Sequence, residues 1–199
     1  PHIKQTFFPP SLRPELLVEL TLPQGASITA TEREAQRLFA ILDAHSDKIE
    51  SYAAYVGRSS PRFVLPVNVK SDADNRAHFV ITANGTEERE QLAAIIAAAR
   101  TDELSGVRVA TRYIQTGPPA DFPVMLRVSA PPTDEVRRVA EQVAAIAADD
   151  PTTANIHLDW AEKSKAVHID FDKEKLKLYG ISARNVKQML YTELTGAQA

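Results

Sequence analysis

The first half of the chain alternates between two hydrophobic periods. Period-two alternation of apolar and polar residues predicts strands, and apolar residues spaced by three and four predict amphipathic helices. The strands are expected at residues 16–22, 49–56, 77–82 and 107–113, and the helices at 31–45 and 86–99. The order strand, helix, strand, strand, helix, strand is the split βαβ, or ferredoxin-like, pattern of an α+β fold. Two helices would then cover one face of an antiparallel sheet.

Short-range signals suggest where these helices begin. Thr31 and Glu34 match a capping box, and Thr86 stands where a second helix cap is expected. Residues 62–69 are a weaker strand candidate, because Pro66 cannot donate to the ladder of a central strand. A turn precedes this stretch, and a polar loop over residues 70–76 follows it.

The pattern restarts after Gly117-Pro118-Pro119, which is the best candidate for a domain boundary. Strands are expected at 124–129, 153–158 and 166–171, with a helix that Thr133 is expected to cap. The opening units of the two halves align at an offset of roughly a hundred residues, which indicates a duplicated domain rather than a solenoid. The fold class is therefore α+β, with one complete ferredoxin-like sandwich followed by a partial second one.

The second half lacks the β-α-β closure of the first. A short helix from Lys173 to Tyr179 and a helix from Ser182 to Leu194 follow instead, and Asp172 is expected to cap the short one. Either the second domain is open, or the chain is a piece of a longer protein. A start at Pro1 rather than at methionine favours the piece.

Composition narrows the classes of function. The 199 residues carry a net charge of −3 with a pI near 6.0, so bulk charge does not indicate a nucleic-acid partner. There are no cysteines, which excludes disulfides, thiol nucleophiles and Cys-ligated zinc. No apolar run is long enough to span a bilayer, and no signal peptide is visible.

Candidate chemistry is sparse. His157 and His168 lie on expected strands that could pair, but two polar strand positions are a simpler interpretation than a metal site. Asp170 and Asp172 form an acidic pair in which Asp172 more plausibly caps a helix. No nucleophile elbow, phosphate-binding loop or dinucleotide fingerprint is present. We therefore expect no enzyme, no resident cofactor and no metal site.

Three segments together resemble the second periplasmic loop of resistance-nodulation-division (RND) efflux pumps of the multidrug, acriflavine-resistance-like type. The first is the opening FFPPSLRPELLVELTLPQGAS, and the second is SYAAYVGRSSPRFVLP. The third and most specific runs from Asn155 to Leu190. The matching positions there are Trp160, Glu162, Asp170, Asp172, Lys175, Gly180, Ile181 and Ser182.

The resemblance implies a domain organisation. Residues 1–14 would be a lead-in after a membrane helix, and residues 15–117 a complete porter subdomain. Residues 118–172 would be the first half of a second porter subdomain, and residues 173–199 the start of a docking region. The membrane helices themselves are absent from this chain.

The resemblance also implies a function. The full protein would be a proton-driven antiporter of a bacterial inner membrane, and this chain would lie in its periplasmic portion. It would form part of an entry and binding cleft for hydrophobic or amphiphilic compounds. The pump would be a homotrimer that works with a periplasmic adaptor and an outer-membrane channel.

Six residues are carried over as candidates for substrate binding. Glu19 is the charged residue on the strand face opposite the leucines, and the others lie in the loop that corresponds to the family's flexible loop. The six are Glu19, Gly57, Arg58, Pro61, Arg62 and Phe63. That loop reads GRSSPRF and is cationic, where known members are rich in glycine and phenylalanine, so anionic or amphiphilic substrates are a hypothesis. Metal export is disfavoured, because the chain has two methionines.

Two other interpretations remain open. One is a stand-alone tandem ferredoxin-like module that binds a ligand, which a closed second sheet would favour. The other is a structural or adaptor protein that acts through its surfaces, which an edge strand paired with another chain would favour.

Overall fold

The computed structural model describes residues 11–117, 122, 124–160 and 163–196. The predictions that rest on Phe7, Phe8, Pro118, Pro119 and Glu162 lie outside the described residues. The chain divides into two compact units, one up to Ser164 and one from Lys165 onward, and each is described by itself.

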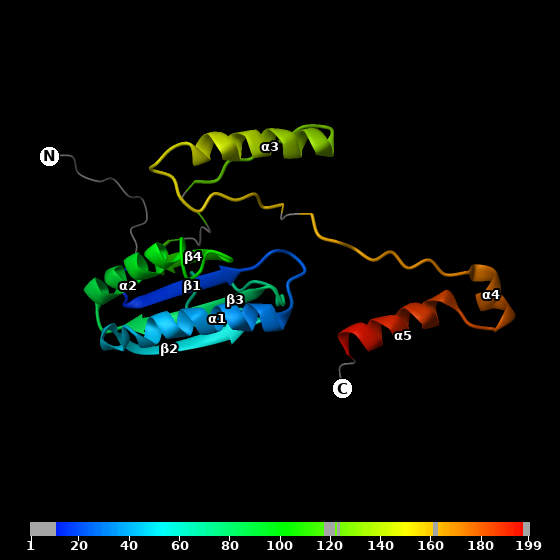
Figure 1. The fold of residues 1–199 in the computed structure, drawn as a ribbon, viewed down its shortest axis with the longest axis horizontal. Helices are drawn as coiled ribbons and strands as arrows, with labels where there is room; N and C mark the ends of the chain where they lie inside the picture. The colour runs from blue at the N-terminus through cyan, green and yellow to red at the C-terminus, as the bar shows by residue number, and fades with distance from the viewer. Residues whose placement is uncertain (1–10, 118–121, 123, 161–162, 197–199) are drawn as a thin grey trace. The chain divides into compact units, whose positions relative to one another are not determined.

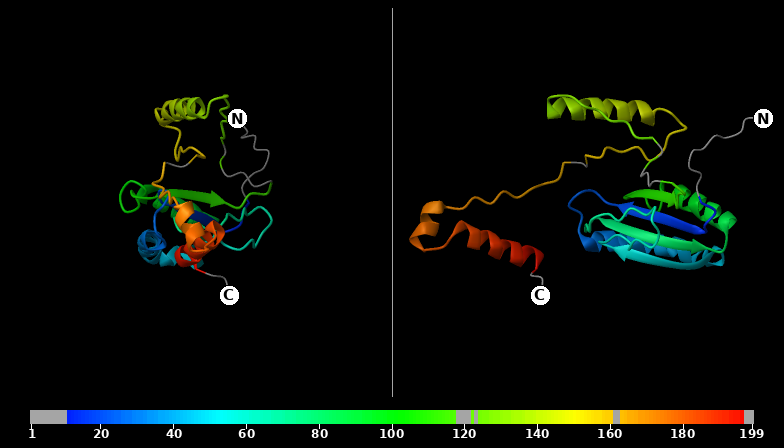
Figure 2. Two further views of the ribbon diagram at one scale, coloured as in Figure 1. Left: turned by 90° about the vertical axis from the view of Figure 1, so that its right-hand side faces the viewer. Right: turned by 180° about the vertical axis from the view of Figure 1, so that it is seen from behind.

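Residues 15–113 form the ferredoxin-like sandwich that the sequence predicts. Four antiparallel strands are ordered β2-β3-β1-β4, and two helices connect them. The elements are β1 (Glu15–Thr21), α1 (Ile28–Asp43), β2 (Ile49–Val56), β3 (Arg76–Ala83), α2 (Thr86–Ala99) and β4 (Arg108–Tyr113). Figure 1 shows the helices in front of the strands, and the right-hand view of Figure 2, from behind, shows the strands in front. The helices therefore cover one face of the sheet.

The core lies between this face and the helices. On β1 the buried residues Leu16, Val18 and Leu20 alternate with the residues of the other face, as period-two patterning requires. Helices α1 and α2 contribute Leu38 and Ile96, both at 0 % exposure. Register pairing sets Val18 beside Phe79 of β3, and Phe79 also contacts Phe39 of α1 with ring centroids 5.2 Å apart.

In neither helix of the sandwich is the predicted residue the cap. The cap of α1 is Ser27, whose side chain accepts from the Ala30 N–H, so the prediction of Thr31 as the cap was wrong. Thr31 is buried in the first turn, and its hydroxyl donates to the Asp74 carbonyl at 2.6 Å. Gly85 precedes α2 in the cap position, and Thr86 is its first helical residue. Several residues near each start can cap, and packing selects among them.

Arg89 of α2 ties the segment before β1 to the sandwich. Its side chain is 4 % exposed, and it donates to the carbonyls of Ser11 and Arg13 at 2.9 and 2.7 Å. Its guanidinium also lies 4.3 Å from the centroid of the Tyr113 ring. A buried cation is tolerated here because it is hydrogen-bonded. The sequence pattern places Arg89 on a helix but does not predict these contacts.

Beyond residue 117 the structure differs from the prediction. Helix α3 (Thr133–Ala148) is present, although Pro132 rather than Thr133 stands in its cap position. The described residues of the three expected strands at 124–129, 153–158 and 166–171 form no strand. Those predictions were wrong as secondary structure. Alternation marks a segment that suits a half-buried face, whereas a strand also needs a neighbouring backbone to pair with. Val124 and Val167 are accordingly 74 % and 89 % exposed.

The unit from Lys165 onward contains α4 (Lys173–Leu178) and α5 (Ala183–Thr195). The Asp172 carboxylate accepts from the N–H groups of Glu174 and Lys175, which confirms it as the cap of α4. Ser182 caps α5 by accepting from the Asn185 N–H. Among the helices in the described ranges, none has the length and apolar character needed to cross a membrane.

Candidate functional site

The candidate site lies on the sheet face that the helices leave uncovered. On β1 this face presents Leu17 and Glu19, the residues that alternate with the core leucines. Strand register sets Glu19 beside His78 of β3 and Ala110 of β4. The loop between β2 and β3, residues 57–75, crosses this face and supplies Lys70. Three strands and one long loop therefore build the site.

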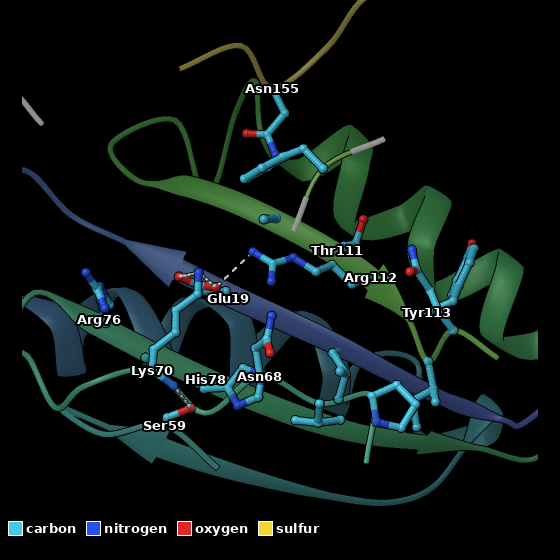
Figure 3. Close-up of a pocket in the computed structure, with 18 of the residues that line it drawn as sticks. Glu19, Ser59, Asn68, Lys70, Arg76, His78, Thr111, Arg112, Tyr113 and Asn155 are labelled. Atoms are coloured by element: carbon cyan, nitrogen blue, oxygen red, sulfur yellow. Dashed lines mark hydrogen bonds and ion pairs between the residues drawn. The ribbon is translucent and has the colours of Figure 1, made fainter. Parts of the chain in front are cut away.

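Glu19 is the centre of a charged cluster. It is 9 % exposed, and Lys70 Nζ lies 2.9 and 2.7 Å from its two carboxylate oxygens. Arg112 of β4 donates to the same carboxylate at 3.2 Å. Figure 3 shows both cationic side chains reaching Glu19. Two cations thus share one carboxylate that is almost completely shielded from solvent.

The cluster sets the ionisation of its members. Burial by itself would raise the pKa of Glu19. The hydrogen bond from Lys70 and the charges of Lys70 and Arg112 outweigh this effect and hold the pKa of Glu19 below its ordinary value of 4.5. The pKa of His78 is lowered from 6.5, mainly because burial disfavours its charged form. Glu19 is therefore charged and His78 neutral at neutral pH.

His78 anchors the loop to the sheet. The N–H of Ser60 donates to His78 Nδ1 at 3.1 Å, so this nitrogen is the acceptor of the neutral ring. Ser59 Oγ accepts from the Lys70 N–H at 3.3 Å, which closes the loop on itself. These contacts hold Lys70 where it reaches Glu19.

A cavity of about 470 Å³ opens beside the cluster. Its lining includes Leu17, Glu19, Lys70 and Arg112, together with residues of the loop and of β3 and β4. Phe122 also borders it, and the Arg112 guanidinium lies 5.4 Å from the centroid of that ring. The volume suits a small organic molecule. Leu17, Val67 and Ile114 form a small buried apolar cluster at this face.

The structure brings together two of the six residues proposed from sequence. Glu19 and Arg58 line the cavity. Gly57 holds the turn after β2, with φ +74°, and a Cβ there would come within 2.9 Å of Ile28 Cδ1, so its role is conformational. Pro61, Arg62 and Phe63 are exposed and do not line this cavity. A role for any of the six in substrate binding stays a prediction.

Sequence reasoning missed Lys70, His78 and Arg112. A signal for two of them was available, because alternation places His78 and Arg112 opposite the core residues of their strands. Lys70 gave no signal, since it lies in a polar loop. His157 and His168 are on no strand in the described structure. His157 Nδ1 lies 3.2 Å from the Asn155 carbonyl, and His168 Nε2 lies 3.0 Å from Asp170.

Tyr113, at the apolar end of the cavity, offers a test of the local packing. Burial and the hydrogen bond from its hydroxyl to Glu90, 2.6 Å long, raise its pKa to about 12. Because the pKa of Tyr113 is higher in the folded protein than its ordinary value of 10.0, the protonated phenol stabilises the fold. This stabilisation is fully present below pH 10 and is lost as the pH rises toward 12. We expect the phenolate absorbance of wild type minus Tyr113→Phe to show one group that titrates near 12. A difference curve centred near 10 would contradict this packing.

Comparison with known proteins agrees with the fold. The family model described as the AcrB/AcrD/AcrF family matches residues 1–199. Among solved structures, the X-ray crystal structure of a heavy metal efflux pump (crystal form II) is similar, with a TM-score of 0.61 and 19 % sequence identity. The match covers 92 % of this chain and 20 % of that chain. At this identity the likeness shows the fold alone. No curated protein matches the sequence significantly.

These findings assign the class. The α+β sandwich, with its four-stranded antiparallel sheet, is similar to an RND pump porter domain. The chain belongs to the AcrB/AcrD/AcrF family of RND efflux pumps, as its motifs indicated. Members of this family are transporters rather than enzymes. The chain spans about a fifth of the length of the heavy metal efflux pump that it matches.

Proposed function

We propose that the chain is part of the periplasmic porter region of a proton-driven RND transporter in a bacterial inner membrane. The family match over residues 1–199 and the porter-like sandwich support this role. In such a transporter the chain works with membrane helices, a periplasmic adaptor and an outer-membrane channel, in a homotrimer. Proton coupling belongs to ionisable groups within the membrane. The contribution of this chain is then to bind and pass substrate.

The observation that carries the binding role is the cavity on the uncovered sheet face. It joins apolar residues, such as Leu17 and Ile114, to the charged cluster at Glu19. Apolar walls with few polar groups accept varied hydrophobic compounds, and a charged end accepts the polar part of an amphiphile. Hydrophobic or amphiphilic small molecules are therefore the proposed substrates.

The test is to fill the cavity. Ala110 of β4 lines it beside Glu19 and is 8 % exposed, so Ala110→Trp places an indole in the binding space. We expect the purified 199-residue chain to bind the neutral fluorescent probe N-phenyl-1-naphthylamine saturably. Ala110→Trp should weaken this binding at least about tenfold.

The matched control is Ala98→Trp, on the exposed side of α2. It adds the same side chain away from the cavity and should change the affinity less than about twofold. Circular dichroism spectra establish that both variants are folded. Equal affinity of wild type and Ala110→Trp, or no saturable binding at all, would overturn the proposed binding role.

A further inference from the structure

The charges that line the cavity are strongly unbalanced. Among its described lining residues, five side chains are cationic and one is a carboxylate. The cations are Arg58, Lys70, Arg76, Arg100 and Arg112, and the carboxylate is Glu19. Since burial keeps His78 neutral at neutral pH, it adds no charge. The imbalance is local, because the whole chain has a net charge of −3.

Glu19 cannot neutralise this set. Lys70 and Arg112 both pair with its single carboxylate, so Glu19 does not also balance Arg58, Arg76 and Arg100. Arg100 donates to a neutral group, the Thr111 hydroxyl, at 3.3 Å. Arg58 lies 3.9 Å from Asp72, and both of these side chains are exposed. Water screens a pair of that kind, so it neutralises the cavity only weakly.

The cavity changes in character along its length, with Arg76 and Lys70 toward one end, the apolar residues toward the other, and Arg112 paired with Leu17 in the register. Strand register places Arg76 of β3 beside Thr21 at the end of β1, one step along the uncovered face from Glu19. Leu17 lies one step in the other direction, where it packs with Val67 and Ile114. Figure 3 shows Arg76 and Lys70 toward one end of the site and Tyr113 toward the other. The cavity is thus amphipathic along its length.

We propose that the preferred ligand of this site is a small amphiphile with one acidic headgroup, such as a carboxylate, sulfonate or phosphate monoester. The headgroup lies among Arg76, Arg58 and Lys70, and the apolar body extends toward Leu17 and Ile114. This proposal rests on the proposed function, because it specifies the substrate class of the same cavity. A cationic amphiphile would meet like charges at the polar end.

Two probes that differ by one sulfonate test the charge requirement. These are 1-anilinonaphthalene-8-sulfonate and its neutral parent N-phenyl-1-naphthylamine, each titrated into the purified 199-residue chain. An apolar cavity alone would favour the neutral probe, which is the more hydrophobic. We expect the sulfonate to bind at least about tenfold more tightly, and its affinity alone to fall as salt is raised.

Two variants should shift the sulfonate affinity in opposite directions. Arg76→Glu should weaken sulfonate binding about tenfold, and Glu19→Gln should strengthen it at least about threefold, because each changes the charge at the polar end. Because both residues line the cavity, each sulfonate affinity is compared as a ratio with the neutral-probe affinity of the same variant, which reports any change in the shape of the cavity. Arg33→Glu, on the exposed face of α1, is the matched control and should change neither affinity.

Each result that differs from these expectations overturns a stated part of the two proposals. Equal or tighter binding of the neutral probe overturns the acidic headgroup and leaves the proposed function standing. Saturable binding of neither probe overturns both proposals. Equal effects of Arg76→Glu and Arg33→Glu assign the attraction to the general field of the protein and overturn the site. Displacement of the sulfonate probe by an equimolar amount of inorganic sulfate makes the ligand a bare anion and overturns the amphiphile.

Discussion

Phe79→Ala is expected to lower the free energy of unfolding by about 3–5 kcal/mol. Phe79 is fully buried on β3, where it pairs with Val18 of β1 and contacts the Phe39 ring of α1. Its removal costs the transfer free energy of the ring and leaves a void between the sheet and the helix. Urea denaturation of the purified chain, followed by circular dichroism, measures the change.

Phe63→Ala is the matched control for this experiment. Phe63 is 43 % exposed in the loop between β2 and β3, so the same truncation should change the free energy of unfolding by no more than about 0.5 kcal/mol. A cost below about 1 kcal/mol for Phe79→Ala would contradict the packing of β3 against α1. Phe63→Leu and Phe79→Leu extend the comparison, and the buried position should again be the more sensitive.

Glu19→Gln is expected to lower the free energy of unfolding by about 2 kcal/mol at neutral pH. The amide keeps the shape of the side chain but removes the negative charge that Lys70 and Arg112 share. Breaking a fully buried pair costs about 3–5 kcal/mol. The value here is smaller because the side chains of Lys70 and Arg112 are 29 % and 24 % exposed.

The pH dependence of this loss provides its own check. The folded pKa of Glu19 lies below its ordinary value of 4.5, so its stabilising effect is present above that value and is lost as the pH falls through the folded pKa. The wild type and Glu19→Gln should therefore differ most at neutral pH and converge in acid. Glu32→Gln, on the exposed surface of α1, should show no such difference at any pH. A gap between wild type and Glu19→Gln that does not change with pH would contradict the assignment of this loss to the charge of Glu19.

The sandwich was predictable because its two hydrophobic periods are strong and complete. The stripe of Leu16, Val18 and Leu20 marks one buried face, and the apolar positions of 31–45 and 86–99 mark the helices that cover it. Helix caps were less predictable, because Ser27 and Thr31 are both good caps and the buried contact of Thr31 with Asp74 is a tertiary one. The strand predictions after residue 117 failed because propensity supplies no pairing partner.

The candidate site was partly predictable. Glu19 stood out as a charge on the face opposite the leucine stripe, and Arg58 as part of a cationic loop, and both line the cavity. Arg62 is also cationic and Phe63 lies next to it in the same loop, yet the path of the loop keeps both out of the cavity lining. Residue type and spacing do not specify that path, because it depends on contacts such as Ser60 with His78.

The local pattern of apolar and polar residues was thus sufficient to predict the α+β sandwich. A strand or helix that buries one face has apolar residues on that face, which recur with a period of two in a strand and 3.6 in a helix. The ion pairs of the candidate site arose only through long-range folding. Lys70 and Arg112 reach Glu19 across 51 and 93 positions of the chain. An ion pair leaves no period in the sequence. It exists because the loop and three strands converge where Glu19 is shielded from water and its charge has to be balanced.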